Sequence, residues 1–143
     1  MLFSFLRPFC ALLLMGCATA VMASPALASA QDDPYGDWVG TLVTDKGTCP
    51  DTYESVLQIR SDKLFFAPAT GTLVLHGTPD KDHKRFHAQL MLKDAKDKPL
   101  PMVFEGHPEG DTIVGVFGTP NCRAHVVLQR PKNTGWSHFL GDR

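Results

Sequence analysis

The stretch Gly36-Asp37-Trp38-Val39-Gly40 decides the fold of this 143-residue chain. It begins a series of short segments in which apolar and polar side chains alternate. Side chains of a β-strand alternate between the two faces of the sheet, so Gly36, Trp38 and Gly40 share one face. A Trp whose neighbours on its face are glycines has room to fold over the end of a narrow barrel. We therefore expect Trp38 to close one end of a β-barrel.

Segments typical of β-strands recur along the chain, separated by turns rich in Gly, Pro, Asp and Asn, and no segment shows an apolar period of 3.6. We expect strands near 37–44, 53–60, 63–67, 72–77, 84–93, 99–105, 112–118 and 122–130. One apolar face per strand and short connections predict an all-β fold, a single eight-stranded antiparallel up-and-down barrel, with a β-sandwich as the alternative. Pro99 and Pro101 predict that the barrel opens at the sixth of these strands.

The Gly36-Asp37-Trp38 segment resembles the G-x-W of the first strand in lipocalin-like (calycin) barrels. In that family a basic residue of the last strand lies across the Trp ring, and the resemblance implies this role for Arg130. A cation over a desolvated indole contributes roughly 1–2 kcal/mol. The resemblance covers only the first and last strands and implies no particular ligand.

Residues 1–30 have the pattern of a signal peptide. A single cation, Arg7, precedes an apolar run from Phe9 to Met22, and Ala28-Ser29-Ala30 matches the A-x-A cleavage pattern. Cleavage there would make Gln31 the first residue of the exported chain. We then expect an N-terminal segment at 31–36, a barrel domain at 37–130 and a C-terminal tail at 131–143.

A bacterial lipoprotein is the alternative interpretation of the leader. Leu14-Met15-Gly16-Cys17 resembles a lipobox, in which case Cys17 would be acylated and the protein would be anchored to a membrane. The apolar run is too short, and too often broken by small residues, for a transmembrane helix. Both interpretations place the domain outside the cytoplasm, in the periplasm or secreted, or held at a membrane by Cys17.

Two of the four cysteines lie in the leader, which leaves Cys49 and Cys122. Two cysteines of an exported chain usually form a disulfide. If the first and last strands are antiparallel neighbours with Trp38 opposite Arg130, the same register brings Cys49 close to Cys122. We therefore predict a Cys49–Cys122 disulfide.

Composition and motifs exclude several classes of function. The chain has 14 Lys and Arg against 15 Asp and Glu, and no basic cluster predicts nucleic-acid binding. We find no nucleophile elbow, phosphate-binding loop, zinc-protease motif or haem motif, and expect neither enzymatic activity nor a cofactor. Some imidazoles and carboxylates cluster around one predicted hairpin and are weak candidates for metal ligands. They are His76, Asp80, Asp82 and His83.

The end of the chain is unusually apolar for a terminus. Trp136, Phe139 and Leu140 follow a segment, Pro131 to Gly135, that breaks the last strand. These residues could fold back as a cap on the open barrel end, or dock in a groove of a protein partner. Of these two interpretations we favour docking in a groove of a protein partner.

An eight-stranded barrel is either filled by its own side chains or holds one small ligand. The chain has enough large apolar residues to fill it, chiefly Phe65, Phe66, Phe86, Phe104 and Phe117. We therefore expect a non-catalytic exported barrel that binds a larger periplasmic or extracellular protein as an accessory subunit, for example of a periplasmic oxidoreductase, or as an inhibitor. The alternative is a carrier of a small apolar ligand in the barrel interior.

Overall fold

A computed structural model describes residues 28–69 and 73–132, and these residues contain β-strands and no helix. The predicted tail residues Trp136, Phe139 and Leu140, and most of the leader with Cys17, lie outside the described residues. The strands are β1 (Gly36–Thr41), β2 (Val43–Gly47), β3 (Glu54–Ile59), β4 (Leu64–Ala67), β5 (Leu75–Gly77), β6 (Phe86–Lys93), β7 (Pro99–Glu109), β8 (Thr112–Thr119) and β9 (Cys122–Leu128).

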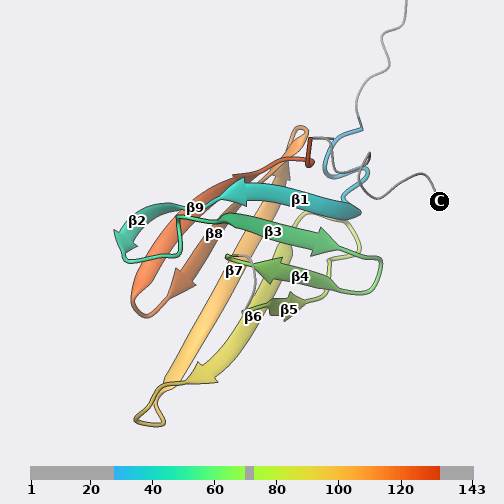
Figure 1. Cartoon of the computed structure of the whole chain (residues 1–143). Coiled ribbons are helices and arrows are strands. Elements are labelled where there is room, and N and C mark those ends of the chain that lie inside the picture. The colour runs from blue at the N-terminus through green and yellow to red at the C-terminus, as the bar shows by residue number, and fades with distance from the viewer. Residues whose placement is uncertain (1–27, 70–72, 133–143) are drawn as a thin grey trace, which may run out of the picture.

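The strands form one antiparallel sheet in the order β1-β3-β4-β5-β6-β7-β8-β9-β2, which curls into a nearly closed barrel (Figure 1). The predicted all-β barrel is confirmed, but with nine strands in place of eight. The predicted first strand is divided at Leu42, whose side chain is 2% exposed. The division lets β1 pair with β3 while β2 pairs with β9, so one bent segment joins the two ends of the sheet.

The first and last strands also meet directly beside Trp38. Val39 and Gln129 exchange two backbone hydrogen bonds, from Val39 N to Gln129 O at 2.8 Å and from Gln129 N to Val39 O at 2.9 Å. This pairing continues into β2 and β9, where Val43 lies opposite His125. A β-bulge between Thr44 and Lys46 then shifts the register by one residue. One register therefore runs from Val39 to Thr44, and beyond the bulge the closure continues shifted by one residue as far as Cys122.

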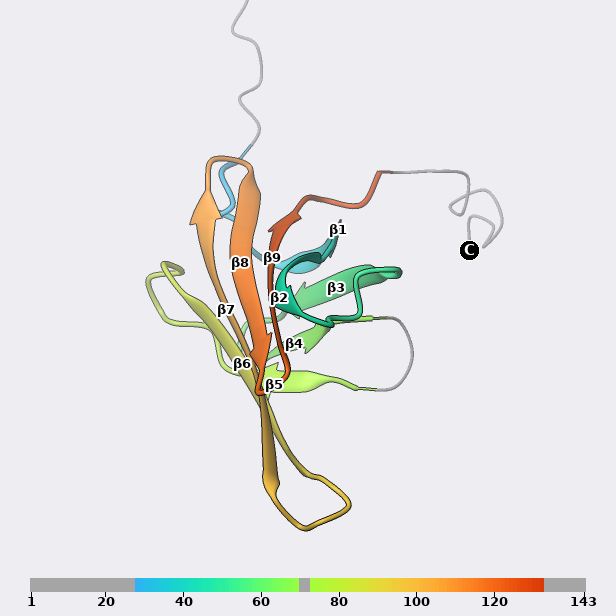
Figure 2. The ribbon, with the colours of Figure 1, turned by 90° about the vertical axis from the view of Figure 1, so that its left-hand side faces the viewer.

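The predicted position of the opening is wrong. β6 and β7 are paired along the whole length of β6, whereas β5 and β6 share only the pair His76 and Gln89. Pro99 and Pro101 lie at the start of β7, before its pairing with β8 begins at Val103. This part of β6 and β7 extends as a hairpin beyond the other strands (Figures 1 and 2). The prolines are accommodated because no third strand needs their missing N–H groups.

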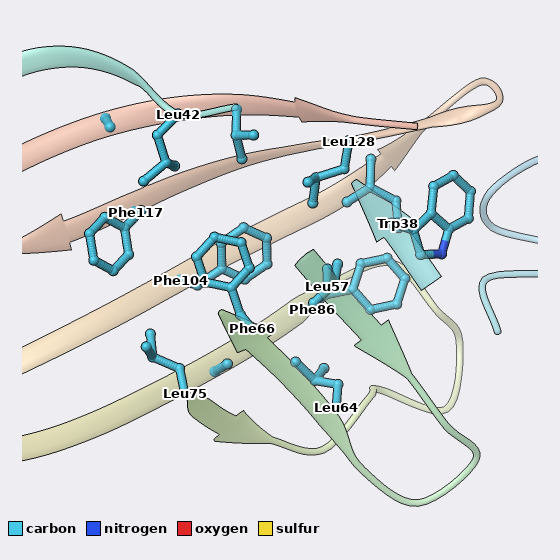
Figure 3. Packing of buried hydrophobic residues seen from close by; sticks show 14 of the residues in the cluster. Trp38, Leu42, Leu57, Leu64, Phe66, Leu75, Phe86, Phe104, Phe117 and Leu128 are labelled. Atoms are coloured by element: carbon cyan, nitrogen blue, oxygen red, sulfur yellow. The ribbon is translucent and has the colours of Figure 1, made fainter. Parts of the chain in front are cut away.

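Aromatic rings fill the barrel (Figure 3). Phe66 and Phe104 stack with ring centroids 4.1 Å apart, and both side chains are fully buried. Gly115 of β8 makes room for this stack, since a Cβ at this position would lie 2.5 Å from the Phe104 ring. Phe86 and Phe117 are buried in the same cluster. Of the five phenylalanines expected inside, only Phe65 is half-buried.

Alternation along the predicted strand 53–60 would place Tyr53, Ser55, Leu57 and Ile59 inside the barrel, and β3 confirms this for most of its length. Ser55, Leu57 and Ile59 of β3 are fully buried. The Ser55 hydroxyl donates a hydrogen bond to Pro68 O at 2.6 Å, so this polar group is satisfied inside the barrel. Tyr53 was expected to continue the inward face, but it precedes β3 and is 62% exposed. The alternation ends there because the chain has left the sheet.

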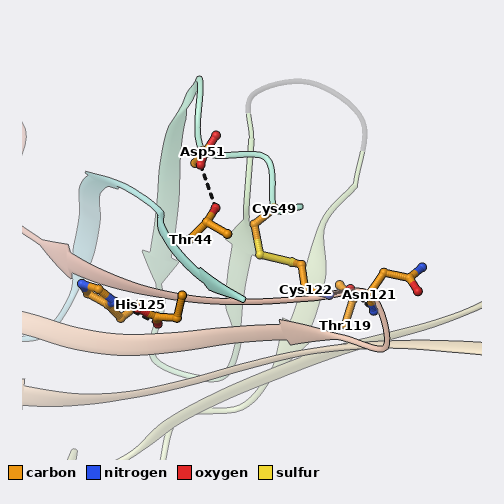
Figure 4. The surroundings of a disulfide bond; sticks show 8 residues. Thr44, Cys49, Asp51, Thr119, Asn121, Cys122 and His125 are labelled. Atoms are coloured by element: carbon orange, nitrogen blue, oxygen red, sulfur yellow. Dashed lines mark hydrogen bonds and ion pairs between the residues drawn. A yellow bond between two sulfur atoms is a disulfide. The ribbon is translucent and has the colours of Figure 1, made fainter. Parts of the chain in front are cut away.

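A disulfide joins Cys49 and Cys122 with their Cα atoms 5.3 Å apart, as predicted (Figure 4). Cys49 follows β2 and Cys122 begins β9, so the bond lies at the end of the β2–β9 pairing. The same loop is held by a 2.7 Å hydrogen bond from Thr44 Oγ1 to Asp51 Oδ2. A disulfide at this position is consistent with an oxidising exported compartment.

Replacing Cys49 and Cys122 by alanine should lower the free energy of unfolding by about 2–4 kcal/mol, because the bond spans 73 residues and restricts the unfolded chain. Urea denaturation of the oxidised protein and of the double variant measures the difference. Under reducing conditions the wild-type protein should have the same free energy of unfolding as the double variant. Coincident curves for the oxidised protein and the variant would show that the disulfide does not stabilise the barrel.

The crossing of β1 over β9 should tolerate only glycine at position 40. An added Cβ on Gly40 would lie 2.4 Å from Val127 O, which is backbone and cannot rotate away. Gly40→Ala should therefore lower the free energy of unfolding by about 1–3 kcal/mol in urea denaturation. Gly118→Ala is the matched control, since the nearest atom to its Cβ would be 4.0 Å away, and its effect should stay within about 0.5 kcal/mol. If Gly40→Ala and Gly118→Ala lowered the free energy of unfolding equally, β1 would not cross β9 as closely as the structure shows.

Candidate functional site

Trp38 seals the barrel at the end where β1 begins (Figure 3). The indole is 1% exposed, and its Nε1 donates a hydrogen bond to Pro34 O at 2.7 Å. The guanidinium carbon of Arg130 lies 4.1 Å from the centroid of the ring. Arg130 thus takes the position that the resemblance to lipocalin-like barrels implied for it.

The Arg130 guanidinium also binds the N-terminal segment. Its Nη1 donates to Tyr35 O at 2.5 Å and its Nη2 to Asp33 O at 2.6 Å. Gly36, which connects this segment to β1, has a φ of 109° and adjoins Arg130 closely enough that a Cβ would lie 2.9 Å from Nη1. Only glycine adopts this φ without strain. Gly36 therefore turns the chain so that two carbonyls face the guanidinium.

Residues 28–35 form part of the domain and cover this end of the barrel (Figures 1 and 2). Ala30 is fully buried, and its N–H donates to Gly110 O in the β7–β8 turn at 2.8 Å. On the other side, His83 Nδ1 donates to Gln31 O at 3.1 Å, and Tyr35 Oη lies 3.1 Å from His83 Nε2. The segment is thus held by three separate parts of the barrel.

A surface pocket of about 410 Å³ lies beside the covered end. Its lining includes Ala28, Asp33, Asp111 and Arg130. The charged side chains of the lining, two carboxylates and one guanidinium, sum to a formal charge of −1.

The weak metal-ligand candidates are not brought together. The His76 ring packs edge-on against Phe65 with centroids 5.1 Å apart, and His83 is bound to the N-terminal segment. Asp82 faces Lys84 at 3.9 Å, while Asp80 contributes a backbone carbonyl to the turn. Among residues 28–69 and 73–132, no three His, Cys, Asp or Glu side chains are placed to hold a metal ion.

Sequence reasoning did not find two histidine–carboxylate pairs on the outer face of the sheet. His87 Nδ1 lies 2.5 Å from Glu105 Oε1, and His125 Nδ1 lies 2.8 Å from Asp45 Oδ1. Each of these histidines alternates with inward-facing neighbours along its strand and so points outward, but the carboxylate it meets depends on strand pairing. The four side chains are 44–52% exposed, so each pair adds little to stability.

Valine side chains lie around these pairs. Val116 of β8 lies between Glu105 and His125 in the strand pairing, and Val43 of β2 lies on the other side of His125. Val127, two residues along β9 from His125, is 49% exposed, and Val43 is 53% exposed. We call the surface formed by Val43, Val116 and Val127 the outer valine face. A shallow pocket of about 500 Å³, lined in part by Val103, Val116 and Arg123, borders it.

No helix within the described ranges is long and apolar enough to cross a membrane. Comparison with protein-family models, curated proteins and solved structures gives no match for this chain.

The Arg130 contacts should stabilise the barrel measurably. Arg130→Ala removes the cation over Trp38 and both donors to the N-terminal segment, and should lower the free energy of unfolding by about 1–3 kcal/mol. The free energy of unfolding of Arg130→Lys should lie between those of the wild-type protein and Arg130→Ala. Lysine keeps the positive charge, but its ammonium group cannot present a planar pair of donors to both carbonyls. Trp38 fluorescence during urea denaturation measures the change in a Trp136→Phe background, which leaves a single tryptophan.

Arg123→Ala serves as the control for Arg130→Ala, because Arg123 is an exposed arginine at the far end of β9, beside Cys122. Its effect should stay within about 0.5 kcal/mol. If Arg130→Ala and Arg123→Ala unfold at the same urea concentration, the barrel end does not depend on the guanidinium.

Proposed function

We propose that this protein is an exported, non-catalytic barrel of lipocalin-like type that binds a larger periplasmic or extracellular protein. It would act as an accessory subunit, for example of a periplasmic oxidoreductase, or as an inhibitor. The filled interior is the observation that carries this proposal. Phe66, Phe86, Phe104 and Phe117 occupy the space in which a carrier of this size would hold its ligand.

The exposed surface supports a protein partner. The outer valine face combines apolar side chains with His125 and Asp45 at its centre, which provide hydrogen-bonding groups among apolar area. Protein interfaces have this mixture of apolar contact surface and a few polar groups. Valine is also common in strands because its branched side chain packs well on a pleated surface, so a binding role is tested by comparing two valines of equal exposure.

The C-terminal residues Trp136, Phe139 and Leu140 form a second part of the proposed contact. Aromatic residues are over-represented among the side chains that contribute most to binding energy. The strand β9 ends at Leu128, on the side of the barrel that Trp38 closes, so the tail begins beside the covered end. Export through the leader, or anchoring through Cys17, would place both surfaces in the envelope.

Matched valine variants test the proposal. Val116 and Val74 are both 38% exposed, but only Val116 belongs to the outer valine face. The protein with an untagged C-terminus is isolated from the envelope fraction, and its complexes are weighed by native mass spectrometry. Val116→Lys should reduce the amount of bound polypeptide at least tenfold, whereas Val74→Lys should retain it, with the two melting temperatures equal.

Deletion of residues 133–143 tests the tail separately and should also weaken retention of the partner. Equal retention by Val116→Lys, by Val74→Lys and by the tail deletion would refute binding through these surfaces. A mass increase of only a few hundred daltons would instead support the small-ligand carrier.

A further inference from the structure

The position at which the leader is removed can be inferred from the contacts of Ser29 and Ala30. Exposure falls along the chain here, from the exposed Ala28 to the half-buried Ser29 and the fully buried Ala30. Ala30 belongs to the hydrophobic core and is bonded through its N–H to Gly110 O at 2.8 Å. The domain therefore begins before Gln31.

Ser29 organises the turn that introduces this segment. Its carbonyl accepts a hydrogen bond from Asp33 N at 3.0 Å, and its hydroxyl oxygen accepts one from Asp32 N at 3.1 Å. The hydroxyl itself donates to Asp32 Oδ2 at 2.7 Å. Cleavage after Ala30 would remove all of these interactions, leave Gly110 O without its donor and take a buried side chain out of the core.

The sequence contains the A-x-A pattern three times, at 18–20, 26–28 and 28–30. The first lies within the apolar run, where a cleavage site does not belong. The choice is therefore between cleavage after Ala28 and cleavage after Ala30. Only the former leaves Ser29 and Ala30 in the exported chain.

We propose that a signal peptidase hydrolyses the bond between Ala28 and Ser29, so that the exported protein begins at Ser29. Water adds across this peptide bond, which leaves a carboxylate on Ala28 and an ammonium group on Ser29. Ala28 shares the pocket at the covered end with Asp33 and Asp111, so the new positive charge arises beside two carboxylates. Opposite charges attract each other, and the pocket's two carboxylates outnumber its one guanidinium, that of Arg130.

This inference rests on the export assumed in the proposed function. Its test is the N-terminal residue of the exported protein, obtained from the intact mass of the reduced, denatured chain and from N-terminal sequencing. A chain that begins at Ser29 is the expected result. A chain that begins at Gln31 overturns the inference and leaves the proposed function standing. A full-length chain, or one acylated at Cys17, overturns the inference and identifies a different export route or none.

Two alanine variants separate the candidate sites, because the peptidase requires small residues at the first and third positions before the bond. Ala26→Asp alters only the site before Ser29, and Ala30→Asp alters the site before Gln31. Ala26→Asp should reduce processing to Ser29 at least tenfold, whereas Ala30→Asp should leave it unchanged. The opposite pattern would assign the cleavage to Ala30. The assay uses denatured extracts, so a variant that fails to fold is still informative.

A stability comparison tests the structural basis independently of the peptidase. Chains that begin at Ser29 and at Gln31 are produced in purified, oxidised form. The shorter chain should melt about 4–8 °C lower, because it lacks the Ala30 contacts. Equal melting temperatures would show that Ser29 and Ala30 contribute nothing to the fold and would remove the reason for the inference.

Discussion

The structure depends on the closure of the first strand segment against the last strand. Residues 36–47 bend at Leu42, and the two halves pair with strands from opposite ends of the sheet. A specific interaction stabilises each end of this closure. Arg130 contacts Trp38 at one end, and the Cys49–Cys122 disulfide lies at the other. The closure removes two long free edges, which would otherwise be available for pairing with other chains.

Closure also determines how the interior can be used. A dry space lined by strands is filled either by the protein's own side chains or by a ligand, and here the aromatic rings of Phe66 and Phe104 meet across the centre. Glycine at position 115 lets this stack press against β8, so the packing depends on the small residue as much as on the rings. A barrel filled in this way has its chemistry on the outside. For this reason the proposed function rests on the exposed valines and the histidine–carboxylate pairs beside them.

The N-terminal segment is a structural part of the barrel despite its polar sequence. It has few apolar side chains, and hydrogen bonds from Arg130, Trp38 and His83 hold its backbone in place. Arg130, Trp38 and His83 therefore serve two purposes. They help to cover one end of the barrel, and they fix the position of the N-terminal segment. His83, which sequence reasoning weighed as a metal ligand, acts here as a bridge between the segment and the β5–β6 loop.

By itself, the sequence determined the fold class, most strand positions and the disulfide, and its resemblance to lipocalin-like barrels implied the contact of Trp38 with Arg130. Alternation with period two, turn residues and the number of cysteines outside the predicted leader depend only on local chemistry, so they can be read without a structure. Tertiary structure alone decided the division at Leu42, the short pairing between β5 and β6, the partners of His87 and His125, and the burial of Ala30. These features depend on strand register and barrel closure, which bring together residues as distant in the chain as Asp45 and His125.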